Sequence, residues 1–428
     1  MKKLSIIVAL CAFVILILPK IFGELVKHQY QTVAAQFAHR PNVTVTNQFT
    51  DWHWFNGKAM TKIILPLGNA KLPPLTVVIN DSISFGPLIW SKNGFTAALA
   101  NSTSTFTVDG LPINPEILTL FNHSLSASTT YTFGMDVLSS MQIQPINATI
   151  SNVHVAAKAM TVNLMIKNRK HVDFLLNWGG MQINTPTLTQ QFGVVNVESH
   201  STVVQGDIYS PQALSTGDFA MSLASVAVEA KTTQKKIMLL NNMLINGHSR
   251  VNKQLMSMAV NYKIAQANFA QHVIKDINLS LLMDNFSVEV LQKIEQISNS
   301  IPKAPSHQQS QQFVTEIFGL ADELLAKKPT IRIKNFSLST LDGQLTSDMS
   351  FAVNEALFNA KNPKSIFKAM NIVGNGQAPE QLLASFGLSP MIEQYVQHGF
   401  IAKQGGLLKL RLTMQHGQLK LNDKVLPY

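Results

Sequence analysis

The chain begins with an apolar run that is followed by long stretches of alternating apolar and polar positions. Residues Leu4 to Leu18 are all apolar except Ser5, and two lysines precede them. As a helix this run spans roughly 22 Å, and continuing it to Gly23 gives about 30 Å, the thickness of the hydrocarbon core of a bilayer. The pattern therefore predicts one N-terminal transmembrane helix, with residues 1–23 as a membrane anchor.

A cleaved signal peptide and a lipid anchor are the alternatives for this run. A signal peptide also has a basic start and an apolar stretch, but the residues from Pro19 to Gly23 lack the small residues at alternate positions that cleavage requires. Lipidation would use Cys11, which lies in the middle of the run behind the bulky Leu10. The residues favour an uncleaved anchor. The positive-inside rule favours a short N-terminus inside and the rest of the chain outside.

The pattern after the anchor first predicts a helix and then many strands. Helical spacing over Glu24 to Arg40 ends at Pro41, which cannot continue a helix. From Asn42 onward apolar and polar residues alternate, and Asn56-Gly57 predicts a hairpin turn. Between residues 95 and 236 the alternation indicates short antiparallel strands with one apolar and one wet face.

The second half of the chain mixes helices and hairpins. Residues 236–266 are compatible with a helix interrupted at Gly247, and residues 298–312, rich in Pro, Ser and Gln, form the predicted linker. The other expected elements are helices over 288–297, 313–327 and 378–398, a strand over 277–283, a hairpin over 331–353 with a bulge near Asn335 and a turn at Asp342-Gly343, and a closing hairpin with a turn at His416-Gly417.

Together these elements predict an α+β protein that is mainly antiparallel β, with peripheral helices. The predicted organisation is the anchor over 1–23, a β-rich extracytoplasmic domain over 24–300, and a C-terminal α+β region over 301–428 that ends in the closing hairpin. The length of 428 residues and the hydrophobic content of 46% suffice for a large core.

The net charge of +10 comes from basic residues that are scattered along the chain. Only residues 231–236 (KTTQKK) form a small cluster, so nucleic acid is not predicted as a partner. A basic exported surface suits proximity to anionic lipid or cell-wall polymer, while a surface that charge merely keeps soluble is the simpler explanation. Because Cys11 is the only cysteine, we expect no disulfide and no cysteine-based site in the exported part.

The chain carries no recognisable motif for catalysis. Its 12 histidines are dispersed, and it has no His-Glu-x-x-His, Gly-x-Ser-x-Gly or phosphate-loop motif, so we predict no cofactor, no metal and no enzyme activity. The most suggestive cluster is Asp51-Trp-His-Trp-Phe55. Strand alternation places Asp51 and His53 on one side of it, and Trp52 and Trp54 on the other. Core packing of the tryptophans is the plain interpretation, and an aromatic ligand-binding patch or acid–base chemistry is the functional one.

Several short motifs occur in a characteristic order along nearly the whole chain. They are the N-terminal anchor and the segments Trp54 to Gly57, Ile83 to Pro87, Pro329 to Val353 and Leu410 to Val425. In this order the chain resembles the YdgA-like family of bacterial envelope proteins of unknown function. The resemblance implies inner-membrane anchoring and a periplasmic, β-rich body, and it supplies no catalytic residues.

Two positions depart from the pattern of that family. Phe85 stands where the family usually has His before Gly86-Pro87, so any chemical role of that His is lost here. Asp423 follows Asn422 where the family typically has Gly. The candidate binding or structural residues are therefore Trp52, Trp54, Gly86 and Pro87.

Three functions fit these observations. The first is a non-catalytic binding or scaffolding protein that is anchored in the inner membrane and contacts its lipids. Its apolar sheet face, at positions such as Leu164 and Leu281, either lines a groove for acyl chains or forms an ordinary core. The second is an interaction module that binds another envelope protein or a second copy of itself. The third is a hydrolase that acts on envelope material.

Overall fold

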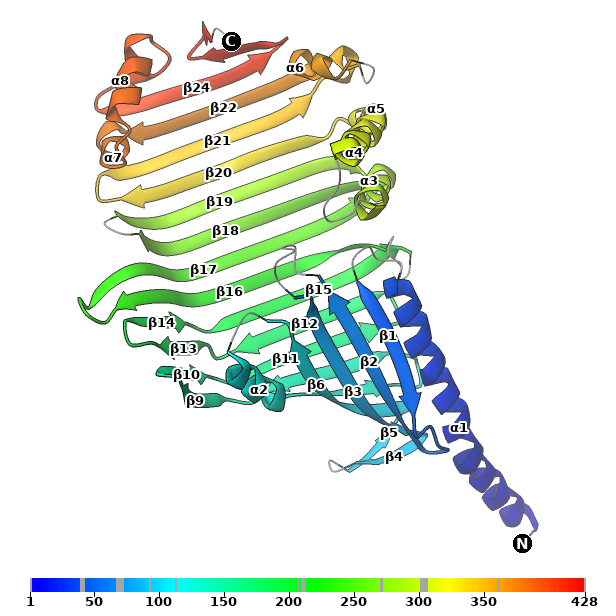
Figure 1. Ribbon diagram of the computed structural model, residues 1–428. Helices are drawn as coiled ribbons and strands as arrows, with labels where there is room; N and C mark the ends of the chain where they lie inside the picture. The colour runs from blue at the N-terminus through cyan, green and yellow to red at the C-terminus, as the bar shows by residue number, and fades with distance from the viewer. Residues whose placement is uncertain are drawn as a thin grey trace. The chain divides into compact units, whose positions relative to one another are not determined.

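The computed structural model describes residues 2–38, 43–66, 73–91, 94–111, 114–206, 208, 213–269, 272–300, 307–359 and 362–426. Most of the described residues form antiparallel strands, with helices at the margins, which confirms the predicted α+β, mainly antiparallel β fold (Figure 1). The chain forms two compact units. Unit 1 holds residues 1–180, 198–215 and 299–304, and unit 2 holds residues 181–197, 216–298 and 305–428.

Unit 1 is built on a sheet in which the strands pair in the order β1, β2, β3, β6, β7, β8, β11, β12. A separate two-stranded sheet joins β4 and β5. The elements of this unit are α1 (Lys2–Ala38), β1 (Thr44–Thr50), β2 (Asn56–Leu65), β3 (Leu75–Phe85), β4 (Leu88–Ser91), β5 (Gly94–Ala97), β6 (Ala100–Asp109), α2 (Pro115–Ser124), β7 (Leu125–Tyr131), β8 (Val137–Ile143), β9 (Ile146–Ile150), β10 (Val153–Ala157), β11 (Met160–Lys167), β12 (His171–Trp178) and, from Glu198 on, β15 (Val195–Gln205).

Helix α1 packs lengthwise on one face of the unit 1 sheet. Val26 of the helix is 3% exposed and shares a core with Ala59, Ile83 and Phe85, while Tyr30 packs at the edge of that core. The predicted helix over Glu24 to Arg40 is thus the second half of one continuous helix that ends at Ala38. Within the described part of the chain, no helix is both long enough and apolar enough to cross a membrane, and the anchor over residues 1–23 stays a prediction.

Unit 2 is a long antiparallel sheet in the order β14, β16, β17, β18, β19, β20, β21, β22, β24, β25, β26. Its elements are β13 (Met181–Asn184), β14 (Leu188–Phe192), β16 (Leu214–Ala230, from Thr216), β17 (Lys235–Asn252), β18 (Leu255–Phe269), β19 (His272–Ser287), α3 (Val288–Ser300), α4 (His307–Gly319), α5 (Ala321–Leu325), β20 (Thr330–Thr340), β21 (Gly343–Val353), two 3-10 turns (Glu355–Leu357 and Pro363–Ser365), α6 (Ile366–Ala369), β22 (Met370–Pro379), α7 (Glu380–Ser385), α8 (Ser389–Gln397), β23 (Ala402–Gln404), β24 (Leu407–Gln415), β25 (Gln418–Leu421) and β26 (Lys424–Val425).

The helices of unit 2 lie at the ends of its strands. Helices α3 to α6 gather at one end and α7 and α8 at the other (Figure 1). A small core of Leu325, Val353 and Ala369, with Phe351 and Ile366 against it, fastens the first group to the sheet. Within the described residues, therefore, no helix packs on either face of the sheet in the middle of the strands.

Several predicted elements of unit 2 are confirmed. Helix α3 begins at Val288, and the helix predicted over 378–398 is present as α7 and α8, which are separated near Gly387. The hairpin β20–β21 turns at Leu341-Asp342, one residue before the predicted Asp342-Gly343 pair, and Gly343 begins β21. Its register shifts between Ile333 and Phe336, where the bulge was predicted. The closing hairpin β24–β25 turns at His416-Gly417.

Other predictions were wrong. Residues 236–266 form β17 and β18 in place of a helix, because their apolar residues alternate on a sheet whose neighbours pair with them on both sides. The helix predicted over 313–327 starts earlier, at His307, and is divided at Leu320 into α4 and α5. In the predicted linker, residues 298–300 and 307–312 are helical, and residues 301–306 lie outside the described residues.

The first hairpin turns five residues earlier than predicted. Residues 51–55 make the turn, with Asp51 at φ 50°, and Asn56-Gly57 already belongs to β2. Gly57 is needed there because a Cβ at this position would lie 2.4 Å from the ring of Trp52. The Asn-Gly pair thus reflects a close packing contact and not the usual hairpin chemistry.

Candidate functional site

The sheet of unit 2 has one continuous apolar face. The strand registers align three rows of side chains across β18, β19, β20, β21, β22 and β24, each row perpendicular to the strands. The rows are Val260, Leu281, Ile333, Met349, Gly374 and Leu412; Met258, Met283, Ile331, Phe351, Ile372 and Met414; and Tyr262, Leu279, Phe336, Ser347, Gly376 and Leu410.

This apolar face keeps part of its surface open. Tyr262 and Met349 are 38% and 39% exposed, and of the three rows only Gly374 and Met414 are buried. In the core of unit 1, by contrast, Ile83 and Phe85 are 1% and 3% exposed. An apolar face that stays partly exposed is a candidate interaction surface, because exposing apolar side chains to water is costly. The predicted inward position Leu281 lies in the first row.

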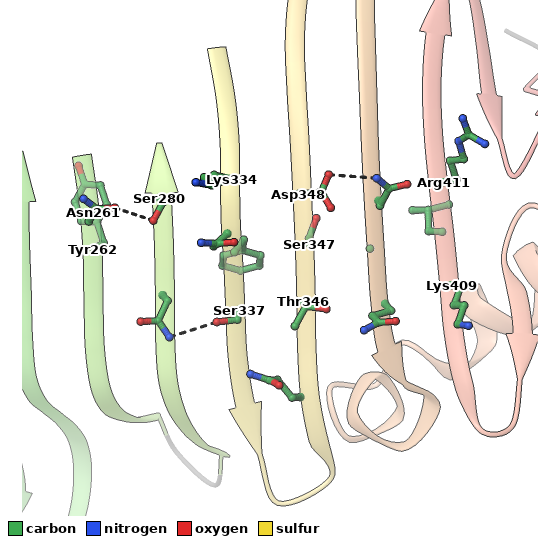
Figure 2. Close-up of a pocket in the computed structure, with 18 of the residues that line it drawn as sticks. Asn261, Tyr262, Ser280, Lys334, Ser337, Thr346, Ser347, Asp348, Lys409 and Arg411 are labelled. Carbon is green, nitrogen blue, oxygen red and sulfur yellow. Dashed lines mark hydrogen bonds between the residues drawn. The ribbon is translucent and has the colours of Figure 1, made fainter. Parts of the chain in front are cut away.

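A groove of about 1040 Å³ crosses the same strands (Figure 2). It is lined mainly by the polar residues that alternate with the three rows, and five members of the third row also border it: Tyr262, Phe336, Ser347, Gly376 and Leu410. Polar side chains pair across its strands: the Ser280 hydroxyl donates to the amide oxygen of Asn261 at 2.7 Å, and the Asn375 amide donates to the carboxylate of Asp348 at 3.2 Å. Among the described lining residues Asp348 is the one acid, and the cations are Lys263, Lys334, Lys409 and Arg411. The groove therefore offers hydrogen bonds and positive charge, which suit a hydroxyl-rich or anionic group.

The structure separates the two candidate tryptophans. Trp52 is half-buried between Phe49 and Phe85, with ring centroids 5.3 and 5.0 Å away, and the Lys27 ammonium lies 5.8 Å from its ring. Trp54 is 46% exposed. Because residues 51–55 form a turn, the strand alternation that grouped the two rings on one side does not apply.

The acid–base interpretation of Asp51 and His53 finds no geometric support. The Asp51 carboxylate accepts a hydrogen bond from the Lys58 ammonium at 2.8 Å on an exposed surface. This hydrogen bond and the charge of Lys58 lower the pKa of Asp51. The main-chain N–H of His53 donates to the carbonyl of Asn56 at 2.8 Å, which fixes the turn. The cluster thus shapes a hairpin.

Gly86 and Pro87 lie at a tight crossing of the chain, where the segment after β3 passes the backbone of Ala98 and Leu99. The Gly86 N–H donates to the carbonyl of Leu99 at 2.7 Å, and a Cβ on Gly86 would lie 1.7 Å from the carbonyl oxygen of Ala98. The peptide bond to Pro87 is cis, and Pro87 leads directly into β4. Phe85, which precedes Gly86, is buried in the core. The motif is needed for packing at this crossing.

A buried carboxylate that the sequence pattern did not single out lies between α1 and the unit 1 sheet. Asp81 is 7% exposed and accepts hydrogen bonds from the Ser104 hydroxyl at 2.5 Å and the Tyr30 hydroxyl at 3.2 Å. It faces a cavity of about 650 Å³ whose other lining residues are mostly apolar. Its sequence signal is an acid at an inward position, between Ile79 and Ile83, in an otherwise apolar alternation.

Burial sets the ionisation of this pair. Desolvation raises the pKa of Asp81, and the hydrogen bonds from Ser104 and Tyr30 offset part of that rise. Burial also raises the pKa of Tyr30, and the nearby Tyr131 and Asp81 add to the effect. At the cavity, the Asp81 carboxylate accepts hydrogen bonds from two hydroxyl groups, those of Ser104 and Tyr30.

We expect Asp81→Asn to stabilise the protein by about 1 kcal/mol near neutral pH. Because the pKa of Asp81 is raised on folding, the folded state holds its proton more tightly. The free energy of unfolding therefore falls as pH rises from the ordinary Asp value through the raised one. Asn keeps an acceptor for the Ser104 hydroxyl and carries no charge. The free energy of unfolding of the variant therefore does not fall with pH through this position. Melting temperatures of both proteins across a pH series measure the difference.

The matched control for this prediction is Asp109→Asn, a change at an exposed Asp of the same unit whose side chain accepts the N–H of Gly110. Its melting temperature should follow that of the wild type at every pH. A gap between wild type and Asp81→Asn that does not widen with rising pH would contradict the assignment of a raised pKa to Asp81.

A second polar cluster lies on the surface of unit 1. The Nδ1 of His200 lies 2.7 Å from a carboxylate oxygen of Asp173, and its Nε2 lies 2.9 Å from that of Glu198. These two hydrogen bonds, the one to Asp173 first, raise the pKa of His200. Both ring nitrogens are thus occupied by carboxylates. Across the described ranges no three or more His, Cys, Asp or Glu side chains are placed to hold a metal ion.

Comparison with known proteins places the chain in a family. No curated protein and no solved structure matches it. The family model described as "Bacterial protein of unknown function (DUF945)" matches residues 1–428. The chain therefore belongs to DUF945, a family of bacterial proteins of unknown function.

Proposed function

We propose that this protein is a non-catalytic lipid-binding protein, tethered to the inner membrane and exposed in the periplasm. The observation that carries the proposal is the open apolar face of unit 2, where three rows of mainly Leu, Ile, Met, Val, Phe and Tyr side chains cross six strands. A single sheet with such a face needs an apolar occupant in water.

The dimensions of the face suit an acyl chain. Six strands at the usual spacing make a surface about 24 Å wide, and one leaflet of a bilayer is roughly 15 Å deep in its hydrocarbon part. An acyl chain laid along one row would therefore be covered over its whole length. The unbranched, flexible Met258 and Met283 add a surface that adapts to different chains.

The proposed location rests on the sequence. The apolar run from Leu4 to Leu18, continued to Gly23 and preceded by two lysines, has the length and charge that favour a single-pass inner-membrane anchor, and the net charge of +10 favours anionic lipid headgroups. Resistance to alkaline extraction from membranes, together with digestion of the body by protease added to spheroplasts, tests this location. Release by alkali would contradict the tether.

The absence of a catalytic role is also part of the proposal. Its support is that the most suggestive titratable groups already have structural partners: Asp51 pairs with Lys58, and His200 is held between two carboxylates. The alternative function is an interaction module that uses the same apolar face to bind another envelope protein or a second copy of the chain.

Site-specific photo-crosslinking in cells tests the occupant of the face. A photoreactive amino acid at position 281 lies in the middle of the apolar face, whereas one at position 244 lies on the opposite face, where Leu244 is 42% exposed. We expect phospholipid adducts at position 281, detected by mass spectrometry of the purified full chain, and at least tenfold fewer at position 244.

The nature of the adduct separates the two functions. Equal lipid labelling at both positions would show only general proximity to the membrane and would contradict a lipid-binding face. Protein adducts at position 281 without lipid would replace the proposal with the interaction module. A doubled mass would then identify a second copy of the chain, and any other mass a different envelope protein.

A further inference from the structure

The hairpin β4–β5 exposes three large apolar side chains to solvent. Leu88, Trp90 and Phe95 are 60%, 75% and 68% exposed. The rings of Trp90 and Phe95 stack edge to face on each other, with centroids 4.2 Å apart. The two strands pair with each other as a separate sheet of unit 1. Such side chains on a small projecting hairpin indicate a contact with something apolar.

More exposed apolar side chains lie at the same end of the unit 1 sheet. A series of main-chain hydrogen bonds joins its turns: Phe85 N–H to the Phe55 carbonyl at 2.8 Å, Gly86 to Leu99 at 2.7 Å, and Leu99 to Tyr131 at 2.9 Å. We call the exposed apolar side chains of these turns the aromatic rim. The rim consists of Trp54, Phe55, Leu88, Trp90, Phe95, Phe133 and Met135, which are between 38% and 75% exposed.

Helix α1 leaves unit 1 at this rim. Tyr30 contacts Asp81 in the middle of β3, whereas Gly23, seven residues earlier, lies against Phe85 at the end of β3. The ring of Phe22 is 6.0 Å from that of Phe133. The helix therefore runs along β3 toward the rim, and its earlier residues project beyond the ends of the strands (Figure 1).

Positive charge lies at the same end. The turn between β11 and β12 reads Lys167-Asn-Arg-Lys170, and the N–H of Asn168 donates to the carboxylate of Asp136 in the β7–β8 turn at 2.9 Å. Arg169 and Lys170 are exposed. Aromatic side chains together with Lys and Arg are the residues that proteins place at the boundary between acyl chains and headgroups.

We propose that the aromatic rim inserts into the interface of the bilayer that holds the N-terminal half of α1, so that unit 1 is docked on the membrane by its turns as well as tethered by its helix. This inference rests on the proposed membrane tether. The apolar run ends near Leu18, and only four residues separate it from Gly23 at the rim. The rim is thus held at the depth of the interface, about 6 Å thick on each side of the core.

Tryptophan quenching by brominated lipids in the full chain tests the docking. The chain contains Trp52, Trp54, Trp90 and Trp178. The full-length protein is reconstituted into vesicles of phosphatidylethanolamine and phosphatidylglycerol that carry bromine either near the headgroup or near the end of the acyl chain. We expect Trp90→Phe to reduce at least twofold the amount of tryptophan fluorescence that brominated lipid removes. Bromine near the headgroup should quench more strongly than bromine near the end of the acyl chain.

The matched control is Trp178→Phe, because Trp178 lies at the far end of β12, away from the β11–β12 turn. This variant should keep the quenched emission of the wild type. Phe at position 90 retains an aromatic ring against Phe95 at an exposed site, so both variants are expected to fold, and their circular dichroism verifies it.

The outcomes separate this inference from the proposed function. If the protein floats with the vesicles and resists alkaline extraction but Trp90→Phe and Trp178→Phe are quenched alike, the docking of the rim is wrong and the tether stands. If the protein does not associate with the vesicles, both the tether and the docking are wrong.

Discussion

Gly86→Ala is expected to destabilise unit 1 by roughly 3–4 kcal/mol. The added Cβ would lie 1.7 Å from the carbonyl oxygen of Ala98, and its other near neighbours are the carbonyl groups of Ala98 and Leu99. These neighbours are backbone atoms, so no side-chain rotation relieves the overlap. The crossing must open, which breaks the hydrogen bond from Gly86 to Leu99. Thermal unfolding of the full chain measures the loss, expected at about 6–16 °C in melting temperature.

Gly319→Ala is the matched control for this substitution. Gly319 is the last residue of α4, and a Cβ there meets no atom within 4 Å. Alanine in a helix is favoured over glycine by about 0.5–1 kcal/mol, so this variant should equal or slightly exceed the wild type in stability. A melting temperature of Gly86→Ala that matches the wild type would show that the close crossing does not exist in the folded protein.

Val26→Asp is expected to detach α1 from unit 1, with a loss of about 3–4 kcal/mol. Val26 is 3% exposed and packs with Ile83 and Phe85, so the substitution removes apolar contact and places a carboxylate without a partner in a dry core. Hydrogen exchange of the main chain around Tyr30 should then accelerate, because the helix is held there by contacts with the sheet and a hydrogen bond to Asp81.

The neighbouring residue supplies the control. Leu25 is 44% exposed on the same helix, and Leu25→Asp adds the same charge without entering the core. It should leave hydrogen exchange near Tyr30 unchanged. Equal acceleration in Leu25→Asp and Val26→Asp would mean that charge on the helix, and not its packing against the sheet, controls the docking.

The two substitutions also bear on the proposed function. Docked α1 fixes the distance between the apolar run and the aromatic rim, so Val26→Asp should weaken the quenching of Trp90 by brominated lipids while the protein stays in the membrane. Leu25→Asp should preserve it. The Asp81 cavity lies directly under the same stretch of helix, which makes the pH dependence of Asp81 a second reporter of this docking.

Alternation along the chain was sufficient to predict the sheet and its two unlike faces. Ile331, Ile333, Phe336 and Leu338 predicted β20 and even its bulge, because a change from odd to even apolar positions has no other simple explanation in a strand. The helices α3, α7 and α8 and the closing hairpin followed from periodicity and from Gly and Pro at their ends. These are local signals, and local physics decides them.

Local signals failed where distant contacts decide the structure. Asn56-Gly57 has the composition of a turn, but the ring of Trp52 requires the glycine inside β2. Residues 236–266 resemble a helix in composition, but two neighbouring strands supply hydrogen bonds that outweigh that preference. The sequence pattern shows Asp81 only as a polar residue within a predicted strand. It could not indicate the buried site, because the donors Ser104 and Tyr30 come from another strand and from α1.

The sequence by itself determined the apolar N-terminal run, the basic charge, the lack of a catalytic motif and a sheet with one apolar and one polar face. Only the tertiary structure decided that the apolar face of unit 2 stays partly open, since alternation is the same for a strand in a covered core and one in an open face. It also decided that Trp54, Trp90 and Phe133 share one end of unit 1 with the exit of α1, because residues far apart in sequence meet there through strand pairing.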